Sequence, residues 1–475
     1  MQFDSLAFVF FFACIASCYW LVRSWSHRKN LLLLASYLFY AGWNPYFLPL
    51  LVVTSFIDWR LALRMSTASS IGARKKWLIL ICSVNLSVLA YFKYVNFFVD
   101  NFNVFAAMLA IPQWDFSSSV ALPIGISFYT FHSLSYCIDV YRRKILATQC
   151  WRDYLLYVAF FPQLVAGPIV RWSTIGEQLA TPRSLEKSNL GLGMVLMTVG
   201  LFQKIVLADA IFAPVANSYF GQDLLQTGIE AWVATLAFSG QIFCDFAGYT
   251  TCAIGAALVL GFHLPVNFQA PYASRGFSDF WRRWHISLSS WLKDYLYVSL
   301  GGNRVRRIRV LLNLMITMLL GGLWHGAAWT YVVWGGLHGI FLVLERVSGR
   351  LIGGFSNRLP RCGGMVAWLS TTLAVVTAWV FFRAETLAQA THMVELMYGD
   401  FPTSTSWLAL LSYEDHIAML TITAIVSLQL LLRDRPLQHL IKMMPWPCMG
   451  LMVGVLLTLI SLTPGQSNAF IYFQF

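Results

Sequence analysis

The sequence predicts an all-α fold, a bundle of membrane-spanning helices in one polytopic domain. Of 475 residues, 58% are hydrophobic and 11% are charged, whereas a soluble domain carries about 25% charged residues. The mean hydropathy is +0.63. Apolar runs of bilayer length alternate with short basic segments, which predicts about a dozen transmembrane or re-entrant helices.

Apolar length and flanking charge place the expected helices in order along the chain. They are expected at about 5–22, 31–43, 46–58, 77–92, 118–138, 189–215, 231–262, 310–344 (as a pair), 363–382, 415–432 and 446–463. Asn44-Pro45 separates the second run from the third by a turn or a kink. The first run begins near Leu6 without a basic segment before it, so we expect a retained span and not a signal peptide.

The net charge of +12 is concentrated in the short segments between apolar runs. These basic segments are 23–29, 60–76, 142–152, 275–309, 346–361 and 433–442. The pattern is typical of cytoplasmic loops beside anionic membrane lipids, and it places both termini outside. The acidic segment 384–414 suits the outer face. No basic patch is interleaved with aromatics as nucleic-acid binding requires, so we expect no nucleic-acid partner.

Residues 153–170 break the regular pattern. They lie between Arg152 and Arg171 and contain Pro162 and Gly167-Pro168. Basic residues at both ends favour a re-entrant loop, which a membrane tolerates where protein or water satisfies the backbone. An ordinary kinked span is an equally open interpretation.

Residues 310–344 contain no Asp, Glu, Lys or Arg but hold His325 and His338. A helix of this length would extend about 50 Å, too long for one crossing of a ~30 Å core. We therefore expect two crossings, with a break at Gly321-Gly322. His325 then lies at membrane depth, where an ionisable group indicates function and where histidine chemistry suits proton transfer.

Residues 276–309 form a basic, amphipathic block. Apolar residues recur at helical spacing and predict one buried face made of Phe277, Phe280, Trp281, Trp284, Leu288, Trp291, Leu292 and Tyr295. Arg282, Arg283, Lys293 and Asp294 occupy the opposite positions. We expect a helix lying on the inner leaflet, with His285 within it.

Three blocks carry a resemblance to a known family. They read Asp279-Phe-Trp-Arg-Arg-Trp-His285-Ile-Ser-Leu-Ser-Ser-Trp-Leu-Lys-Asp-Tyr, Leu300-Gly-Gly-Asn303-Arg and Gly322-Leu-Trp-His325-Gly-Ala-Ala-Trp. Supporting blocks lie at 123–131, 136–142, 161–169 and 243–249. The chain resembles the membrane-bound O-acyltransferases, most of all the bacterial branch that acylates alginate, peptidoglycan, cellulose and teichoic acid.

The resemblance implies an acyl donor reached from the cytoplasm and an acceptor on the outer side. The family's invariant histidine falls on His325, which we expect to be the general base that takes the acceptor hydroxyl's proton. A hydrogen-bonded structural histidine is the alternative, and an acyl-enzyme intermediate stays open. The second recurring position falls on His285, which would polarise the thioester carbonyl, position the donor, or serve only structure.

The resemblance also implies acetyl-CoA as donor substrate. We expect Arg282, Arg283 and Arg304 near the acyl-CoA entrance, with Asn303 either lining it or forming a plain turn. The sequence has no nucleotide-binding glycine loop and no metal-ligand cluster, so neither a permanently bound cofactor nor a metal is expected.

Four further polar residues lie in apolar runs. His338 follows His325 by 13 residues and so faces nearly the opposite way on one helix. We therefore expect His338 to pack against Trp334. Lys204 and Asp209 suggest an ion pair or snorkelling, and Asp245 is a candidate wall of the substrate tunnel.

These observations predict one acyltransferase domain over 1–475, with a catalytic core at about 118–345 and peripheral helices at 1–117 and 346–475. We expect an O-acetyltransferase of a bacterial inner membrane that passes acetyl groups toward an exported polysaccharide through an extracytoplasmic partner protein. The glycan, alginate or another, is not specified. D-alanyl transfer from a carrier protein is one alternative. A proton-coupled transporter is another, but no internal repeat supports it.

Overall fold

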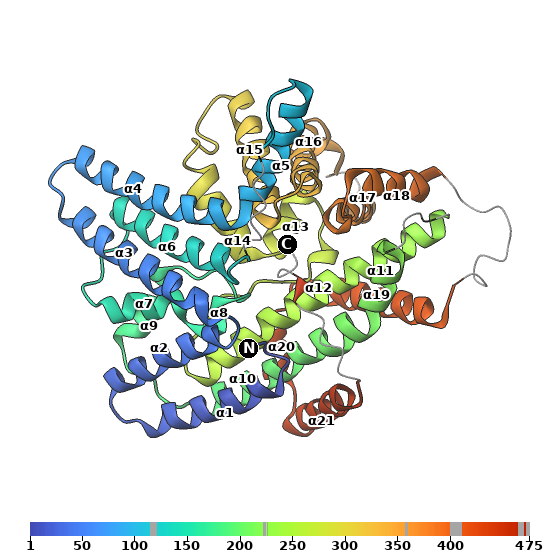
Figure 1. Cartoon of the computed structure of the whole chain (residues 1–475). Coiled ribbons are helices and arrows are strands. Elements are labelled where there is room, and N and C mark those ends of the chain that lie inside the picture. Colours follow the sequence, from blue (N-terminus) through green and yellow to red (C-terminus); the bar gives the residue numbers. More distant parts are fainter. Residues whose placement is uncertain are drawn as a thin grey trace. The chain divides into compact units, whose positions relative to one another are not determined.

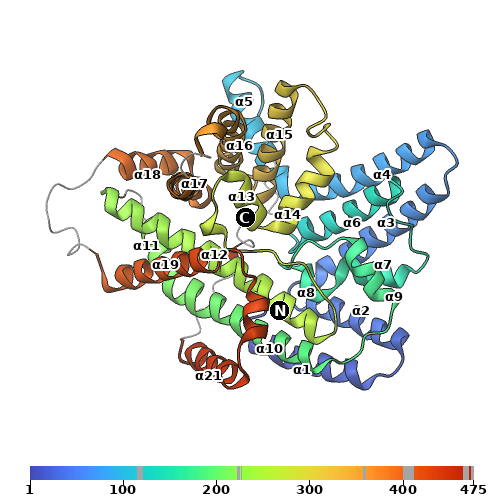
Figure 2. The same ribbon diagram turned by 180° about the vertical axis from the view of Figure 1, so that it is seen from behind.

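The computed structural model describes residues 1–114, 121–221, 225, 227–356, 360–399, 411–463 and 470–471. Within these ranges all regular structure is helical, without a strand, which confirms the predicted all-α fold. Chain contacts define a first unit, residues 1–194 with 253–265, and a second unit, residues 195–252 with 266–475. Figures 1 and 2 show the helices from opposite sides.

Seven helical stretches in the described ranges are long and apolar enough to cross a membrane. They are Pro45–Thr67, Ile71–Met108, Lys187–Phe220, Gly228–Val259, Arg307–His325, Gly363–Arg383 and Tyr413–Leu431. Each overlaps an apolar run predicted from the sequence. Two shorter apolar helices, Leu6–Leu21 and Trp446–Leu462, accompany them. The chain is a multi-pass membrane protein, and the total of about a dozen crossings stays a prediction.

The first unit is built around α6. Its helices are α1 (Leu6–Leu21), α2 (Trp25–Ala41), α3 (Leu48–Thr67), α4 (Ile71–Leu89), α5 (Val95–Met108), α6 (Ile126–Tyr141), α7 (Trp151–Ala159), α8 (Phe161–Leu164) and α9 (Trp172–Ala180). α6 packs against α3 and α4, and α2 packs against α7. α6 starts later than the predicted 118–138 because Gly125 precedes it at φ +72°, while residues 118–120 lie outside the described ranges.

The chain after Arg152 is broken, not kinked. α7 ends at Ala159, α8 is a short helix, and the backbone from Val165 to Arg171 is not helical. Side chains satisfy this buried backbone: Gln163 Nε2 donates to the Tyr157 carbonyl at 2.6 Å and the Tyr157 hydroxyl donates to the Val170 carbonyl at 3.0 Å. Such satisfaction is what irregular backbone needs at membrane depth. Its re-entrant path through the membrane remains a prediction.

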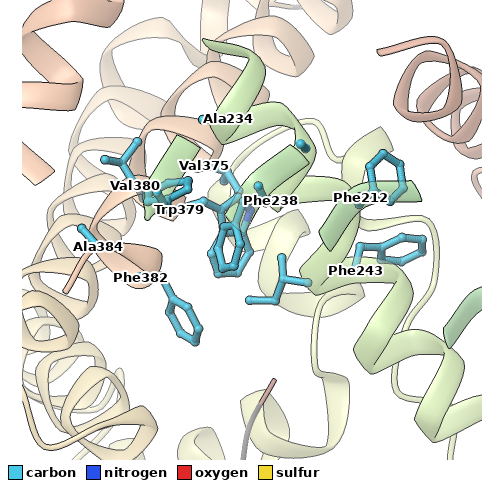
Figure 3. Close-up of a cluster of buried hydrophobic side chains, with 14 of the residues drawn as sticks. Phe212, Ala234, Phe238, Phe243, Val375, Trp379, Val380, Phe382 and Ala384 are labelled. Carbon is cyan, nitrogen blue, oxygen red and sulfur yellow. The ribbon is translucent and has the colours of Figure 1, made fainter. Parts of the chain in front are cut away.

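The second unit holds the remaining helices. They are the second half of α10 (Lys187–Phe202), the π-helix η3 (Gln203–Phe212), α11 (Ala213–Phe220), most of α12 (Gly228–Val259), α13 (Phe277–Arg283), α14 (Ile286–Trp291), η5 (Leu292–Tyr297), α15 (Arg307–His325), α16 (Trp329–Ser356), α17 (Pro360–Arg383), α18 (Leu387–Gly399), α19 (Tyr413–Leu431), α20 (Leu437–Met443) and α21 (Trp446–Leu462). Figure 3 shows the core between α12 and α17, where Phe238 lies beside Trp379.

The acidic segment 384–414 contains a helix that the sequence did not predict. α18 buries Ala390, Met393 and Met397, a narrow apolar stripe at helical spacing. Polar residues separate these apolar ones, so the segment has no continuous apolar run of the length that predicted the membrane spans. Residues 400–410 of this segment lie outside the described ranges.

A buried ion cluster links η3 to α12. Lys204 Nζ lies 2.9 Å from Asp209 Oδ1 and 2.7 Å from Asp245 Oδ1. Asp245 Oδ2 accepts the backbone N–H of Ile471 at 2.8 Å. The predicted ion pairing of Lys204 with Asp209 is confirmed. Asp245 completes the cluster as a second carboxylate beside Lys204, and its place in a tunnel wall stays a prediction.

The predicted break at Gly321-Gly322 is wrong. α15 continues through both glycines to His325, and the chain turns at residues 326–328 before α16 begins. A Cβ atom at Gly322 would overlap the Tyr331 carbonyl, and one at Gly335 would overlap the Met318 carbonyl. These glycines therefore bring the backbones of α15 and α16 together, as small residues do between membrane helices.

We predict that Gly335→Ala destabilises the protein by about 1–3 kcal/mol, because the new methyl group meets a backbone carbonyl that cannot rotate away. Gly336→Ala is the matched control, since a Cβ there meets only Leu319 Cδ2, at an ordinary 3.5 Å. Thermal unfolding of the two purified variants measures the difference. Equal midpoint temperatures would contradict the proposed close packing.

Candidate active site

His285 lies at a sharp break between α13 and α14. Its φ is +43°, in the left-handed region, where histidine is more frequent than most residues with a side chain. The prediction of one helix along the apolar face Phe277–Tyr295 is therefore wrong. Its predicted apolar face is nevertheless largely buried, as Trp284 and Leu288 show, while Arg282 and Lys293 on the other face are exposed.

Backbone pairing with an earlier segment holds this break. The Gln269 N–H donates to the Arg283 carbonyl at 3.0 Å, and the Ile286 N–H donates to the Asn267 carbonyl at 2.9 Å. Each bond satisfies a group that a continuous helix would have paired internally. The segment 266–270 thus fixes where His285 points.

Asn267 determines the tautomer of His285. Its Oδ1 accepts the Ser287 backbone N–H at 3.1 Å and the Ser287 hydroxyl at 2.9 Å. The same oxygen lies 3.2 Å from His285 Nδ1. Because an amide oxygen only accepts, Nδ1 must carry the proton and Nε2 the lone pair. Sequence reasoning missed Asn267, which belongs to none of the blocks that indicated the site.

Burial keeps His285 neutral. The side chain is fully buried, and Phe246 meets it edge-on with 4.6 Å between ring centroids. Desolvation by this burial lowers the pKa of His285 to about 3. The imidazole is therefore uncharged at neutral pH.

His325 ends α15 and is 3% exposed, so its side chain is buried in the protein, and its depth in the membrane stays a prediction. Its ring centroid lies 4.9 Å from that of Trp324, 5.0 Å from Trp334 and 5.2 Å from Phe382. Trp324 also contacts His285, with 6.1 Å between centroids. The two predicted catalytic histidines are thus both buried in the second unit and share one aromatic neighbour, Trp324.

His338 packs as the sequence predicts. It is fully buried, and its ring lies 4.8 Å from Trp334 and 5.1 Å from Trp281. Trp334 therefore contacts both histidines of the 310–344 run. The ring contacts of His338 fit the packing role predicted for it.

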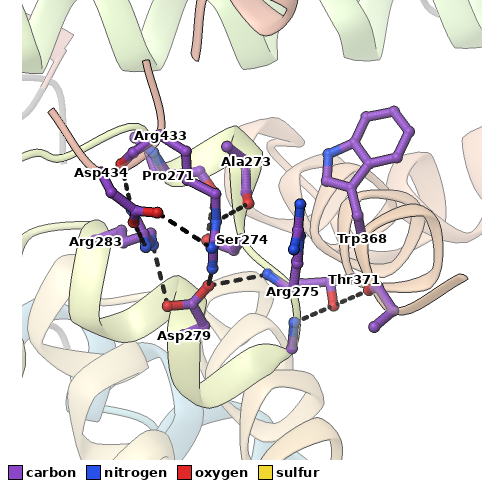
Figure 4. A network of polar contacts seen from close by, with 12 residues as sticks. Pro271, Ala273, Ser274, Arg275, Asp279, Arg283, Trp368, Thr371, Arg433 and Asp434 are labelled. Carbon is purple, nitrogen blue, oxygen red and sulfur yellow. Dashed lines mark hydrogen bonds and ion pairs between the residues drawn. The ribbon is translucent and has the colours of Figure 1, made fainter. Parts of the chain in front are cut away.

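An ion network anchors α13 (Figure 4). Asp279 Oδ1 lies 3.0 Å from Arg283 Nε, and its Oδ2 lies 2.6 Å from Arg433 Nη2. Arg283 Nη2 continues to Asp434 Oδ1 at 2.8 Å. Burial opposes ionisation of Asp279, but the Arg275 backbone N–H and the two guanidinium groups lower its pKa overall. The network joins α13, which leads into His285, to the segment after α19.

Comparisons with known proteins identify the family of the chain. Residues 151–382 match MBOAT, the membrane-bound O-acyltransferase family. The chain is 42% identical over 400 residues to the probable alginate O-acetylase AlgI of Pseudomonas aeruginosa, covering 84% of this chain and 75% of that protein. The chain belongs to the membrane-bound O-acyltransferase family. The predicted resemblance and the assignment as an acyltransferase are confirmed.

Two other relatives of the chain are named for different cell-envelope polymers. This acyltransferase is 36% identical over 431 residues to the peptidoglycan O-acetyltransferase of Helicobacter pylori, covering 84% of the chain and 80% of the relative. It is 28% identical over 268 residues to the teichoic acid D-alanyltransferase of Streptococcus thermophilus, covering 52% and 63%. His285 and His325 both lie within the family match.

The remaining predicted site residues of the acyltransferase lie on α13 and on a turn before α15. Asn303 accepts a hydrogen bond from the Tyr297 hydroxyl at 2.7 Å and follows Gly301 and Gly302, both at positive φ. It is thus a turn residue, although an exposed one. Asn313, which sequence reasoning missed, supports the turn by donating to the Leu300 carbonyl at 3.1 Å.

The three arginines predicted at the donor entrance differ in their surroundings. Arg282 and Arg304 are exposed, whereas Arg283 is already held by two carboxylates in the Asp279 network. Within the described ranges, no three His, Cys, Asp or Glu side chains gather as a metal ion would require. The binding of a donor by any of the three stays a prediction.

Proposed function

We propose that this acyltransferase moves an acetyl group from cytoplasmic acetyl-CoA to an acceptor hydroxyl on the other side of the membrane. An extracytoplasmic partner protein then completes transfer to an exported polysaccharide. The observation that carries the proposal is the contact of Trp324 with both His285 and His325, two buried histidines. The acetyl group is favoured because the P. aeruginosa and H. pylori relatives, at 42% and 36% identity, are both named for O-acetylation.

In this proposal His325 is the general base. Its neutral imidazole takes the proton from the acceptor hydroxyl while that oxygen attacks the thioester carbonyl carbon. A carbon–oxygen bond forms and the carbon–sulfur bond breaks. The imidazolium then returns its proton to the leaving thiolate, so free coenzyme A and neutral His325 result.

His285 acts as a positioning residue for the donor. Its Nδ1–H faces Asn267, so Nε2 offers a lone pair and no proton. A nitrogen that only accepts cannot polarise a carbonyl by donation, but it can accept an amide N–H of the donor's pantetheine arm. Of the two chemical roles predicted from the sequence, this geometry favours orientation over polarisation.

The exposed Arg282 and Arg304 are our proposed contacts for the coenzyme A phosphates, since guanidinium groups match phosphate oxygens. Arg283 is less suited because Asp279 and Asp434 already neutralise it. We place the protein in a bacterial inner membrane with both termini outside, following the basic segments. Acetyl-CoA is then a substrate, and no bound cofactor is required.

Purified protein in lipid nanodiscs, supplied with acetyl-labelled acetyl-CoA, tests the proposal. We expect release of free coenzyme A, measured with a thiol reagent, and stimulation by the partner protein. Turnover only with a D-alanyl carrier protein would favour D-alanyl transfer. Label that crosses a proteoliposome membrane without thiol release would indicate a transporter and overturn the proposal.

We predict that Asn267→Leu lowers turnover about 10- to 100-fold, because His285 loses the group that sets its tautomer and direction. Asn267→Asp keeps an acceptor oxygen and should retain more activity than the leucine variant. Ser287→Ala is the matched control, since it removes one of the contacts to Asn267 Oδ1 and leaves the contact with His285. Coenzyme A release measures all three, and equal loss in Ser287→Ala and Asn267→Leu would contradict the positioning role.

A further inference from the structure

A pocket of about 460 Å³ lies within the second unit, apart from the two histidines. Helices α10, η3, α12, α19, α20 and α21 contribute to its lining, which is mostly apolar and includes Leu207, Ile425, Leu440 and Leu456. The volume falls within the range of about 300–1,000 Å³ typical of ligand pockets. Its apolar walls suit a hydrocarbon chain.

Two glutamines, Gln203 and Gln429, are among the residues that line the pocket. Gln429 is 8% exposed, and its Oε1 accepts the Tyr272 backbone N–H at 2.8 Å. This bond fixes which end of the amide is the oxygen, so the opposite atom is the donor Nε2. In the part of the chain that the structure describes, Gln429 Nε2 and Gln203 Oε1 have no hydrogen-bond partner. A buried amide without a partner costs free energy. A ligand with a carbonyl acceptor and a hydroxyl donor would satisfy both.

A positively charged side chain, that of Arg435, belongs to the same pocket. Arg435 lines it and is exposed, and no carboxylate pairs with it among the described residues. Its neighbours Arg433 and Asp434 belong instead to the Asp279 network. Arg435 also lies within the basic segment 433–442, expected beside the inner leaflet, where anionic headgroups are concentrated.

We propose that this pocket binds one anionic glycerophospholipid of the inner leaflet. An acyl chain occupies the apolar part, an ester carbonyl accepts from Gln429 Nε2, and the phosphate lies at Arg435. A hydroxylated headgroup, as in phosphatidylglycerol, supplies the donor for Gln203 Oε1.

The occupied pocket also supports His285. Phe268 forms part of the pocket wall, and the residue before it is Asn267, the partner of His285. The Phe268 ring lies 5.0 Å from Phe246, which lies 4.6 Å from His285. A bound chain therefore packs against the segment that fixes the histidine. This consequence for activity rests on the proposed function, whereas lipid binding does not.

Native mass spectrometry of delipidated protein, mixed with phosphatidylglycerol or phosphatidylcholine, tests the site. We expect one tightly retained phosphatidylglycerol on the wild type. Arg435→Gln should lower the preference for phosphatidylglycerol about fivefold, the effect of one lost cation. Leu456→Trp should fill the pocket and remove retention of both lipids. Lys76→Gln, an exposed basic residue of the first unit, is the control and should bind as the wild type does.

Equal retention of the two lipids by the wild type, or unchanged retention by Arg435→Gln, would overturn the proposal. Binding of inorganic phosphate with no retained lipid would do the same, as it would show an anion site without a chain site. Thermal unfolding checks that Leu456→Trp is folded, and Arg435→Gln tests the site independently of it. Because the readout is lipid mass, failure of acetyl transfer leaves this test intact.

Discussion

Replacing His325 with alanine should lower coenzyme A release by about 10²- to 10⁴-fold, the contribution of a positioned general base. His325 is the buried histidine that ends α15 among Trp324, Trp334 and Phe382. With the imidazole gone, no described side chain in those contacts can take the hydroxyl proton. Turnover in nanodiscs measures the loss, and donor binding should persist because the proposed donor contacts lie elsewhere.

His338→Gln is the matched control for this experiment. His338 is equally buried and also contacts Trp334, so its replacement disturbs the same aromatic core without removing the proposed base. We expect the rate of His338→Gln to stay within about tenfold of the wild type, a smaller loss than removal of a general base causes. Activity of His325→Ala above that of His338→Gln would disprove the assignment of His325.

Replacing His285 with alanine should lower kcat/KM for acetyl-CoA about 100-fold, since misplacing a reactant by about 1 Å has that effect. The loss should fall largely on KM if His285 holds the pantetheine arm. His285→Gln offers an acceptor oxygen in place of Nε2 and should recover part of the affinity. His285→Leu, which fills the space without an acceptor, should not.

The pH dependence gives a second readout for His285. Burial lowers its pKa to about 3, so the side chain stays neutral from about pH 5 to 8 and becomes protonated only near its lowered pKa. The wild type and His285→Gln should therefore have pH–rate profiles of the same shape in that window. An acid limb near pH 6.5 that disappears in His285→Gln would show that His285 titrates during turnover, and would contradict the positioning role.

The sequence predicts the membrane helices better than it predicts the site between them. α12 and α17 follow from long apolar runs, because bilayer-spanning segments must satisfy their own backbone. The break at His285 does not follow, because apolar residues keep helical spacing from Phe277 through Tyr295. What interrupts the helix is backbone pairing with Asn267 and Gln269, a contact between segments that no local pattern encodes.

The glycines of α15 illustrate the same limit. Adjacent glycines locally favour a break, and Gly321-Gly322 suggested one. In the folded chain Gly322 instead faces Gly335 across the α15–α16 contact. His325 was found because an ionisable group stands out in an apolar run and in a family block. Asn267 has neither signal, so its role depends on the tertiary structure.

The Lys204 cluster has a consequence for how the protein enters the membrane. A lone carboxylate at the centre of a helix costs about 2.5–3.5 kcal/mol on insertion, and Asp245 lies within α12 with its countercharge on the preceding helix. Lys204 already has Asp209 on its own helix. The segment Lys187–Phe220 can thus enter the lipid with Lys204 paired to Asp209. The insertion of α12 costs less free energy if Lys204 is already in the membrane to pair with Asp245. Biosynthesis in chain order provides that neighbour first, so the cluster favours sequential integration of these two segments at the translocon.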